Sequence, residues 1–426
     1  VQPADGNHLE ESGGDGGMKW EKVKLGKYVE ILSGFAFKSK DFLNCGVPVI
    51  KIKNITQEGV TLEDVSYISK ELADKNEKYH LNYNDILIAL TGSHINQMSS
   101  VVGRIARIKY HEDSLLNQRV GKVFAKDSKL CDIDYVYYFL SQDYIKISLA
   151  SKAGGAANQA NISPNDVKSL TVRWPDIETQ HRIADILSAY DDLIENNQKQ
   201  IKLLEEAAQR LYKEWFVDLR FPGHENTKIV DGVPEGWSVY PFSSKVDIMS
   251  GGTPKTSIPD YYNGKIPFYT PKDSDGAFFA YKTQINITEG GLKNCNSRLY
   301  PPKTVIITAR GTVGKTTILA VPMAMNQSCY ALKMKENDAP YYLFFALNNE
   351  IKALQTMANG GVFNTIIGKT FDSINIQIPN DPLIYGFEKT VRPFMEQIKN
   401  KLQANSKLVE ARDRLLPKLM SGEVKV

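Results

Sequence analysis

The chain repeats one pattern twice, and this duplication constrains its fold more than any other feature. Trp20 opens the stretch W-E-K-V-K-L-G-K-Y-V-E-I-L-S-G, and Trp237 opens W-S-V-Y-P-F-S-S-K-V-D-I-M-S-G, 217 residues further on. The Ser-Gly pair that closes each stretch, at Gly34 and Gly251, keeps the same spacing. A repeat of about 200 residues has the size of a domain and is far longer than a solenoid repeat. The sequence therefore predicts two similar domains related by a pseudo-two-fold axis.

Further landmarks recur in the same order, while their spacing shrinks from 217 to 204 residues. The matched pairs are Leu90-Thr91-Gly92 with Ala309-Arg310-Gly311, Asn117-Gln118 with Asn326-Gln327, Gly154-Gly155 with Gly360-Gly361, and Trp174-Pro175 with Ile378-Pro379. Insertions and deletions in loops produce such a drift, so we expect the copies to share a frame and to differ in their loops.

Short β-rich runs separated by Gly, Pro and Asn predict strands joined by turns in both copies. In the first copy we expect strands at 47–52, 85–90, 101–108 and 120–125, and helical structure from 131 to 150. In the second copy we expect strands at 266–269, 304–308, 316–321 and 328–333, and a helix at 340–357. Each copy is therefore predicted to be a mixed α+β domain.

A heptad pattern follows each copy. The first seam is Ile183, Leu187, Tyr190, Ile194, Asn197, Ile201, Leu204, Ala208, Leu211 and Trp215. The second, 204 residues later, is Phe387, Val391, Phe394, Ile398, Lys401, Asn405, Leu408, Arg412, Leu415 and Leu419. Steps that alternate between four and three residues over more than four heptads are typical of a coiled coil. Two seams in one register predict an antiparallel helix pair within the chain.

The signals at the helix ends are also informative. Asp176, which follows a proline, is a good N-cap for the first long helix. Pro382 suits the start of the second helix, and Pro417 is expected to end or kink it near its last turn. The predicted organisation is a tag-like leader at 1–17, a first domain at 18–175, a spacer helix at 176–216, a linker at 217–236, a second domain at 237–379 and a C-terminal spacer helix at 380–426. The predicted fold class is α+β, with the two mixed α/β domains separated by the helix pair.

Composition excludes some classes of protein. No apolar run reaches the length of about 18 residues that a membrane span needs. The net charge is +3, or +7 without the four acidic residues of the leader 1–17, and it permits nucleic-acid binding without requiring it. The cysteines form no C-x-x-C motif, so we expect four isolated, buried thiols in a reducing cytoplasm. The six histidines show no metal-ligand spacing.

The segment Ala309–Thr316 ends in Gly-Lys-Thr like a phosphate-binding loop, but Ala309 occupies the place of the required first glycine. It also lies between two strand-like runs and not before a long helix. We therefore expect an exposed turn that offers Arg310, Thr312 and Lys315 to a polyanion. The sequence contains no H-E-x-x-H, no G-x-S-x-G and no Asn-Pro-Pro-aromatic motif of amino methyltransferases. We predict no catalytic residues, no metal and no cofactor for this chain.

Polar, Gly-containing loops recur at matching places in the two copies. Lys and Arg can neutralise phosphates, and Asn, Gln and Arg can read base edges through paired hydrogen bonds. In the first copy the candidate DNA-binding residues are Lys38, Lys40, Lys51, Lys53, Asn54, Thr91, Ser93, His94, Asn96, Gln97, Gln118, Arg119, Lys152, Asn158 and Gln159. In the second copy they are Thr253, Lys255, Lys272, Ser274, Arg310, Thr312, Lys315, Gln327, Asn359 and Asn364. The alternative for any one of them is an ordinary turn residue.

The chain resembles a known family, the specificity subunits of type I restriction-modification systems. The resemblance runs from Met18 to the end of the chain. Its most specific parts are Thr179–Leu187 (T-Q-H-R-I-A-D-I-L), Glu195–Gln198 (E-N-N-Q), Leu211–Phe216 (L-Y-K-E-W-F), Phe221–His224 (F-P-G-H) and Arg414–Gly422 (R-L-L-P-K-L-M-S-G).

The resemblance implies two target-recognition domains, a helical spacer and a bipartite double-stranded DNA target with an unspecified gap. It also implies a non-catalytic subunit whose partners supply the chemistry: two copies of a methyltransferase subunit that uses S-adenosylmethionine, and ATP-driven restriction subunits bound through them. Two alternatives stay open. One is a self-contained DNA modification or restriction enzyme, which would bind S-adenosylmethionine itself, and the other is a coiled-coil assembly scaffold without a role on DNA.

Overall fold

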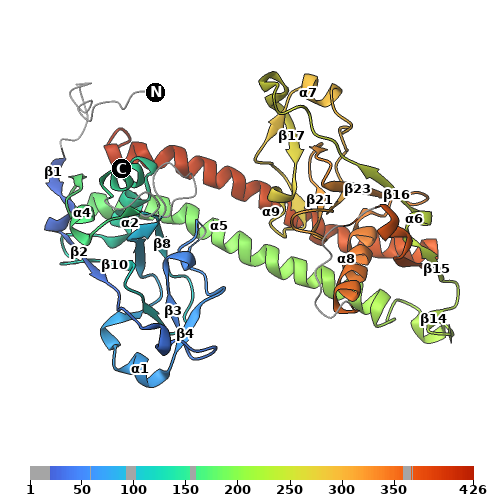
Figure 1. Cartoon of the computed structure of the whole chain (residues 1–426), viewed down its shortest axis with the longest axis horizontal. Helices are drawn as coiled ribbons and strands as arrows, with labels where there is room; N and C mark the ends of the chain where they lie inside the picture. Colours follow the sequence, from blue (N-terminus) through green and yellow to red (C-terminus); the bar gives the residue numbers. More distant parts are fainter. Residues whose placement is uncertain (1–19, 58, 93–101, 154–159, 358–365, 367) are drawn as a thin grey trace. The chain divides into compact units, whose positions relative to one another are not determined.

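The computed structural model describes residues 20–426 except 58, 93–101, 154–159, 358–365 and 367. The chain divides into two compact units, which we call unit 1 (Val1–Asp192 with Leu408–Val426) and unit 2 (Leu193–Lys407). Each unit contains one globular domain and a part of both long helices (Figure 1). In the described part of the chain, no helix is long and apolar enough to cross a lipid bilayer.

Two sheets form most of the β structure of unit 1. The larger is antiparallel, with the order β2 (Val29–Ser33), β10 (Val120–Ala125), β6 (Ile86–Ala89) and β8 (Ile105–Arg107). The smaller has the order β4 (Ser66–Ile68), β3 (Val47–Ile50), β9 (Ser114–Leu116) and β5 (His80–Leu81), with β3 and β9 parallel. Two further antiparallel pairs are β1 (Glu21–Lys24) with β12 (Thr171–Trp174), and β7 (Thr91–Gly92) with β11 (Ala160–Asn161).

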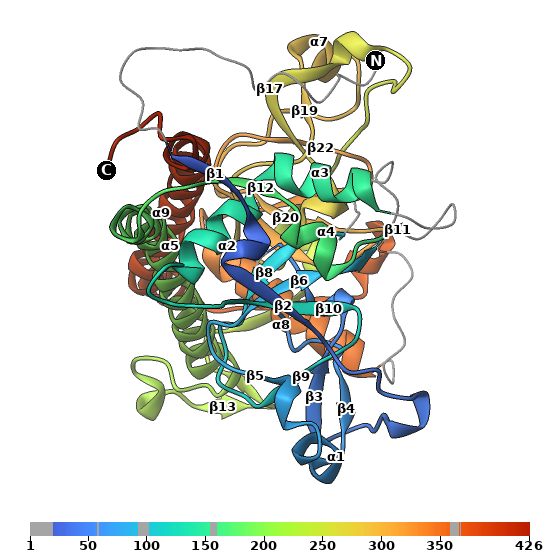
Figure 2. The same cartoon turned by 90° about the vertical axis from the view of Figure 1, so that its left-hand side faces the viewer.

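The short helices of unit 1 are α1 (Lys70–Asp74), α2 (Ile133–Ser141), α3 (Asp143–Lys152) and α4 (Pro164–Lys168). Figure 2 shows α1 beside β3 and β4 at one end of the unit, with α2, α3 and α4 toward the other end. The carboxylate of Asp132 caps α2 by accepting from the backbone N–H groups of Asp134 (2.7 Å) and Tyr135 (3.1 Å).

Unit 2 repeats this plan. Its main sheet has the order β16 (Val246–Ser250), β23 (Cys329–Met334), β20 (Val305–Thr308), β21 (Thr316–Leu319) and β18 (Phe279–Ala280). Its smaller sheet has the order β19 (Asn286–Ile287), β17 (Tyr262–Tyr269) and β22 (Ala324–Met325), and β17 pairs with β22 in parallel. The remaining elements are β15 (Ser238–Pro241) paired with β24 (Asn375–Ile378), and the helices α6 (Phe242–Lys245), α7 (Glu289–Lys293) and α8 (Pro340–Met357).

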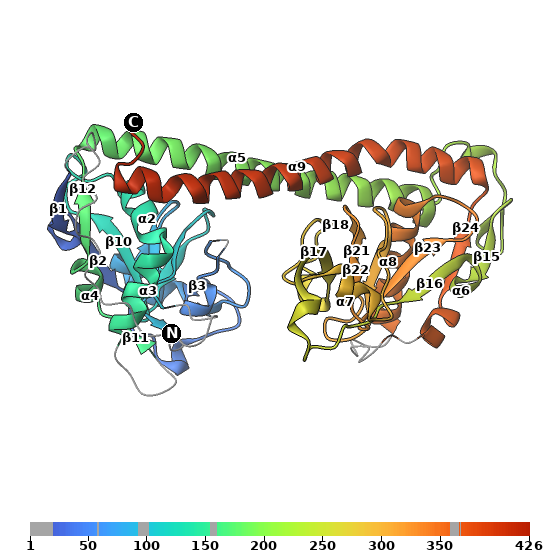
Figure 3. The ribbon, with the colours of Figure 1, turned by 90° about the horizontal axis from the view of Figure 1, so that it is seen from above.

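The two long helices are α5 (Ile177–Tyr212), which continues into a π-helical turn (Lys213–Val217), and α9 (Asp381–Ser421). Asp176 accepts hydrogen bonds from the backbone N–H and the hydroxyl of Thr179, both at 2.9 Å, which confirms the predicted N-cap. Within each unit the helices lie side by side and antiparallel (Figure 3). All twenty predicted seam residues are buried or half-buried, so the heptad prediction is confirmed.

The helices belong to the hydrophobic cores of the domains. In unit 1, Ile183 and Leu187 of α5 and Leu419 of α9 pack with Tyr138 and Phe139 of α2. In unit 2, Tyr212 of α5 and Phe387 of α9 pack with Tyr342 and Phe345 of α8. Because each domain shares its core with both helices, the helix pair is a structural part of each unit and not a separate rod.

Several predictions differ from the structure. The helical stretch at 131–150 is broken at Gln142, which adopts an extended backbone (ψ 135°) between α2 and α3. The helix α9 continues past Pro417 to Ser421, so this proline does not end it. The predicted linker contains the β13 (Ile229–Val230) and β14 (Val233–Pro234) hairpin. All four cysteines are free thiols, but Cys45 is exposed and Cys295 is only partly buried, contrary to expectation.

Candidate nucleic-acid interface

The loops that the sequence singled out in the first copy lie side by side at one edge of unit 1. The backbone N–H of Gln118 donates to the carbonyl oxygen of Phe35 at 2.9 Å, and that of Leu90 donates to Arg119 at 3.0 Å. Leu90 in turn accepts from the N–H of Ile162 at 2.9 Å. We call this assembly the loop edge of unit 1, made of segments 34–40, 51–54, 90–92, 117–119 and 160–162.

Segment 51–54 joins the same edge through the end of β3. The N–H of Asn117 donates to the carbonyl oxygen of Ile50 at 3.2 Å, which places the start of segment 51–54 next to the Asn-Gln turn. Five loops that are distant in the sequence therefore meet through backbone hydrogen bonds.

Unit 2 builds the same edge with the corresponding residues. Asn326 N–H donates to the carbonyl oxygen of Tyr269 at 3.0 Å, as Asn117 does to Ile50 in unit 1. The N–H of Ala309 donates to the carbonyl oxygen of Ser328 at 2.7 Å, and the carbonyl oxygen of Ala309 accepts from the N–H of Ile366 at 3.0 Å, as Leu90 does with its partners. The loop edge of unit 2 consists of segments 251–255, 270–274, 309–315, 326–328 and residue 366.

Glycine is required where the strand end approaches the Asn-Gln turn. A Cβ atom at Gly34 would overlap the carbonyl oxygen of Asn117, and a Cβ atom at Gly251 would overlap that of Asn326. Only glycine allows so close an approach of two backbones. The Ser-Gly and Asn-Gln landmarks of the duplication are therefore two halves of one contact.

The structure distributes the candidate residues of unit 1 unevenly. Exposed side chains belong to Lys38, Lys40, Lys53, Gln118, Arg119 and Lys152. The candidates Ser93, His94, Asn96, Gln97, Asn158 and Gln159 lie outside the described residues.

Three candidates of unit 1 have internal partners instead. Asn54 is fully buried, and its amide binds the backbone of Lys51 (3.1 Å) and Glu63 (3.0 Å). Thr91 is buried, and its hydroxyl donates to Asn161 at 2.8 Å. Lys51 is half-buried, with its ammonium 2.8 Å from Ser66 Oγ. These three side chains shape the loops and do not point out of them.

The candidates of unit 2 are more accessible. Exposed side chains belong to Thr253, Lys255, Lys272, Arg310, Thr312, Lys315 and Gln327, whereas Ser274 is half-buried. Asn359 and Asn364 lie outside the described residues. The hydroxyl of Thr253 donates to Gln327 Oε1, which links two of the loops, and that of Thr312 donates to the carbonyl oxygen of Pro271 at 3.2 Å.

The phosphate-loop-like segment is a turn, as expected. It joins β20 to β21, which pair antiparallel, and Gly311 and Gly314 both have φ of 81°. The turn is closed by Gly314 N–H, which donates to the carbonyl oxygen of Thr308 at 2.9 Å. Arg310, Thr312 and Lys315 are exposed on it.

The exposed cations of the two edges are uncommitted. Among the described residues, no ion pair involves Lys38, Lys40, Lys53, Arg119, Lys255, Lys272, Arg310 or Lys315. The half-buried Lys51 differs, because partial burial lowers its pKa and the neighbouring charge of Lys53 adds to that effect. Each loop edge therefore presents free positive charge and side-chain amides, which suits a polyanion with polar edges.

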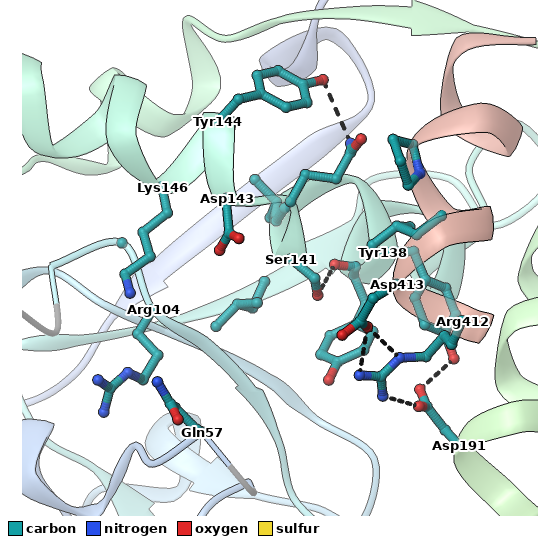
Figure 4. A pocket seen from close by; sticks show the side chains of 17 residues that line it. Gln57, Arg104, Tyr138, Ser141, Asp143, Tyr144, Lys146, Asp191, Arg412 and Asp413 are labelled. Carbon is teal, nitrogen blue, oxygen red and sulfur yellow. Dashed lines mark hydrogen bonds and ion pairs between the residues drawn. The ribbon is translucent and has the colours of Figure 1, made fainter. Parts of the chain in front are cut away.

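Sequence reasoning missed a polar cleft of about 620 Å³ in unit 1 (Figure 4). Arg412 of α9 donates to Asp191 of α5 at 2.5 Å and to Asp413 at 2.8 Å, and the Tyr138 hydroxyl of α2 donates to Asp191 at 2.7 Å. The signal available in the sequence was Arg412, a charged residue at a seam position of the heptad pattern, where apolar residues are usual. Arg104 lies at the other side of the cleft.

Unit 2 has a comparable cleft of about 590 Å³, but without this network. The hydroxyl of Tyr135 on α2 donates to the carbonyl oxygen of Arg173, and that of Tyr342 on α8 donates to the carbonyl oxygen of Gln377. Both acceptors lie in the strand that precedes a long helix, β12 or β24, which marks the two tyrosines as equivalent. Three residues further on, Tyr138 corresponds to Phe345, whose ring stacks on that of Tyr212. At this one position, the domain contacts the helix pair through a polar network in unit 1 and through stacked aromatic rings in unit 2.

No group of three or more His, Cys, Asp or Glu side chains that could hold a metal ion occurs within the described residues. The acidic cluster at the cleft is engaged by Arg412, and Asp132 is engaged by His181 of α5.

Comparisons with known proteins agree with this architecture. The curated relatives include the MjaIX specificity subunit of Methanocaldococcus jannaschii, 26% identical over 417 residues that cover 96% of this chain and 94% of the relative. Another is the HindI specificity subunit of Haemophilus influenzae, 27% identical over 66% of this chain and 74% of the relative. Both are named as subunits of type I restriction enzymes.

The fold is also found among solved structures. The crystal structure of the S subunit of a type I restriction-modification system from M. genitalium superposes with a TM-score of 0.58 and 17% sequence identity, covering 94% of this chain and 96% of that one. Two segments of this chain, residues 18–206 and 234–405, match the family described as the type I restriction modification DNA specificity domain. The chain, with one such segment in each copy of its duplication, belongs to that family.

Proposed function

We propose that this chain is the sequence-recognition subunit of a type I restriction-modification complex, and that each loop edge contacts one half of a bipartite duplex target. The observation that carries the proposal is the pair of loop edges, which share one backbone frame and carry different side chains. A common frame fixes how each domain meets the duplex, while the differing side chains select different bases.

The chemistry of the edges supports this role. The exposed lysines and arginines can neutralise phosphates, and the exposed glutamines and Arg310 can hydrogen-bond to phosphates or base edges. The membership of the chain in the DNA specificity domain family and the names of its relatives point the same way.

We further propose that α5 and α9 set the gap between the half-sites. They are the elements that both units share, and α5 alone, with 36 residues, is about 54 Å long at 1.5 Å per residue. One added heptad lengthens a helix by about 10.5 Å, or about three base pairs of duplex. A heptad inserted in both seams should widen the gap by that amount and leave both half-sites unchanged. An unchanged gap in an active variant would mean that the helices only serve assembly.

The partners we propose are two methyltransferase subunits that use S-adenosylmethionine, with restriction subunits bound through them, all in the cytoplasm. The relatives are named as specificity subunits of restriction enzymes, and such subunits act within larger complexes. The competing function is a self-contained methyltransferase. Binding of S-adenosylmethionine, or methylation of DNA, by the purified chain alone would favour that competitor.

A DNA-binding assay with the full chain tests the proposal. Affinity for duplex DNA should fall steeply with salt, because lysine and arginine contacts release counterions. Replacing Lys315 with Ala should lower the slope of log K against log salt by about 0.9 for the lost phosphate contact. Lys202→Ala, which removes an exposed lysine on α5, should leave the slope unchanged. A wild-type affinity that does not depend on salt would contradict the proposal.

A further inference from the structure

The Asn-Gln pair occupies the same turn in both loop edges. The turns are closed by hydrogen bonds from Val120 N–H to Asn117 O at 2.9 Å, and from Cys329 N–H to Asn326 O at 3.2 Å. Both turns also lie against the glycine that ends the first strand of the main sheet, as described above. The pair is therefore held at one defined place in each unit.

The asparagine and the glutamine of the pair differ in whether the fold accounts for their side chains. Asn117 is 8% exposed, and Asn326 is half-buried with its Oδ1 accepting from the N–H of Ser328 at 3.0 Å, so both asparagine side chains are largely covered by the fold. Gln118 and Gln327 are both exposed. In the described part of unit 1, no hydrogen bond engages the Gln118 side chain, so the fold does not account for a glutamine there.

The residues around the glutamines are not shared. Arg119 follows Gln118, whereas Ser328 follows Gln327. Thr253 binds Gln327, but its counterpart two residues after the strand-ending glycine in unit 1 is Ala36. The glutamine is thus the constant exposed side chain of a turn whose neighbours vary.

A constant side chain in two domains that read different sequences should contact something that both half-sites contain. The sugar-phosphate backbone is the same in every half-site, whereas base edges differ. A glutamine amide can donate to a phosphate oxygen, and such contacts fix register without carrying sequence information.

We infer that Gln118 and Gln327 are positioning residues, each of which donates its side-chain amide to a backbone phosphate of its own half-site. The inference rests on the proposed function. The differing neighbours, such as Arg119, which Ser328 replaces in unit 2, are then the groups available to discriminate between bases.

Three variants at each site test the inference in the full chain, assayed with its methyltransferase partner on the target that methylated-site sequencing identifies. Gln118→Ala and Gln327→Ala should each weaken binding about ten-fold or more, as for loss of a hydrogen bond to a charged group. The ratio of cognate to mismatched affinity should stay unchanged. Gln→Lys at either position should restore affinity, because an ammonium group also donates to phosphate, and Gln→Glu should weaken binding more than Ala.

Replacing single phosphates of the DNA with neutral analogues locates the contact. Methylphosphonates placed singly along each half-site should reveal one position where wild type loses affinity but the Gln→Ala variant loses nothing further, because both changes remove the same interaction. Gln198→Ala, which removes an exposed glutamine on α5, is the matched control and should behave like wild type throughout. Unchanged thermal unfolding shows that each variant is folded.

Two results would overturn the inference. If Gln→Ala relaxed specificity at a single base pair and Gln→Lys did not restore affinity, the glutamine would contact a base and not a phosphate. Gln→Ala with wild-type affinity and specificity would make it inert. Failure of the proposed function is distinct, since then the wild-type complex itself would show no sequence-specific binding.

Discussion

Asn197 of α5 donates its side-chain amide to Oδ1 of Asn405 on α9 at 2.8 Å, inside the seam of unit 2. Asn405 also donates to the carbonyl oxygen of Ile194 at 3.3 Å, and Lys401 donates to Asn197 at 3.4 Å. Polar groups at seam positions of coiled coils fix the register of the helices at some cost in stability. This cluster therefore specifies how α5 and α9 align within the unit.

The first prediction concerns this pair. Asn405→Leu alone should lower the free energy of unfolding by about 1–3 kcal/mol, because it leaves the half-buried Asn197 amide without its partner. Asn197→Leu together with Asn405→Leu should recover most of that loss, since no unpaired amide remains. Denaturant unfolding of these two variants and of Asn197→Leu alone gives the coupling energy. Additive losses in the double variant would show that the two amides do not act as a pair.

The second prediction concerns pH. Glu388 of α9 is 4% exposed and accepts from the N–H groups of Tyr341 and Tyr342 at the start of α8, both at 2.8 Å. Burial raises the pKa of Glu388 from 4.5 to about 7, and the nearby charge of Asp338 adds to that effect. The folded state therefore binds this proton more tightly than the unfolded chain does. The stabilisation is complete below pH 4.5 and is lost as the pH rises through 7.

Glu388→Gln should remove this dependence. The fall in unfolding free energy between about pH 4.5 and 7 should shrink by roughly 3 kcal/mol at most, at 1.36 kcal/mol per pKa unit. Replacing the exposed Glu206 of α5 with Gln is the matched control and should leave the pH profile as in wild type. Identical profiles for Glu388→Gln and wild type would contradict the assigned protonation.

The third prediction concerns the polar network of unit 1. Tyr138→Phe removes the hydroxyl that donates to Asp191 and should destabilise the unit by about 1.5–3 kcal/mol, the range for a hydrogen bond to a charged group. Tyr144→Phe alters another tyrosine of the same cleft, which is 58% exposed and whose hydroxyl accepts a long hydrogen bond of 3.4 Å from Gln142, and should change stability by less than about 0.5 kcal/mol. Differential scanning calorimetry separates the two outcomes. Equal effects would show that the network contributes no more than an exposed hydroxyl.

The fourth prediction concerns the glycine contact of the loop edge. Gly251→Ala should destabilise unit 2 by about 1–3 kcal/mol, because its Cβ would meet backbone atoms of Met325 and Asn326 that cannot move independently. It should also weaken DNA binding, since the Asn-Gln turn would be displaced. Gly368→Ala is the control in the same unit, because a Cβ there meets nothing within 4 Å. Equal stability of the two variants would show that the turn tolerates displacement.

Much of the frame could be predicted because it depends on periodicity and repetition. The heptad seams, the capping by Asp176 and most strands follow from side-chain patterns that are local in the sequence. The duplication also identified the loops that meet at each edge, since both copies had to build the same contacts. Gly34 and Asn117 recur as landmarks in the sequence, although the sequence does not show that they are in contact.

What could not be predicted depends on contacts between distant residues. Asn54 and Thr91 looked like exposed loop residues, but partners at Glu63 and Asn161 bury them. The break at Gln142 could not be predicted from the helical pattern of 131–150. It depends on the burial of Gln142 and on the hydrogen bond that its side chain donates to the carbonyl oxygen of Phe139. The pairing of Arg412 with Asp191 depends on the register of α5 against α9, which the seam alone leaves open.

The most direct test of the account exchanges one domain. Residues 237–379 are replaced by the equivalent domain of a relative with a different target, and the methylated sites in cells that carry the hybrid complex are sequenced. The account predicts that one half of the target changes, while the other half and the gap stay as in wild type. Changes in both halves, or in the gap alone, would contradict the assignment of one domain to one half-site.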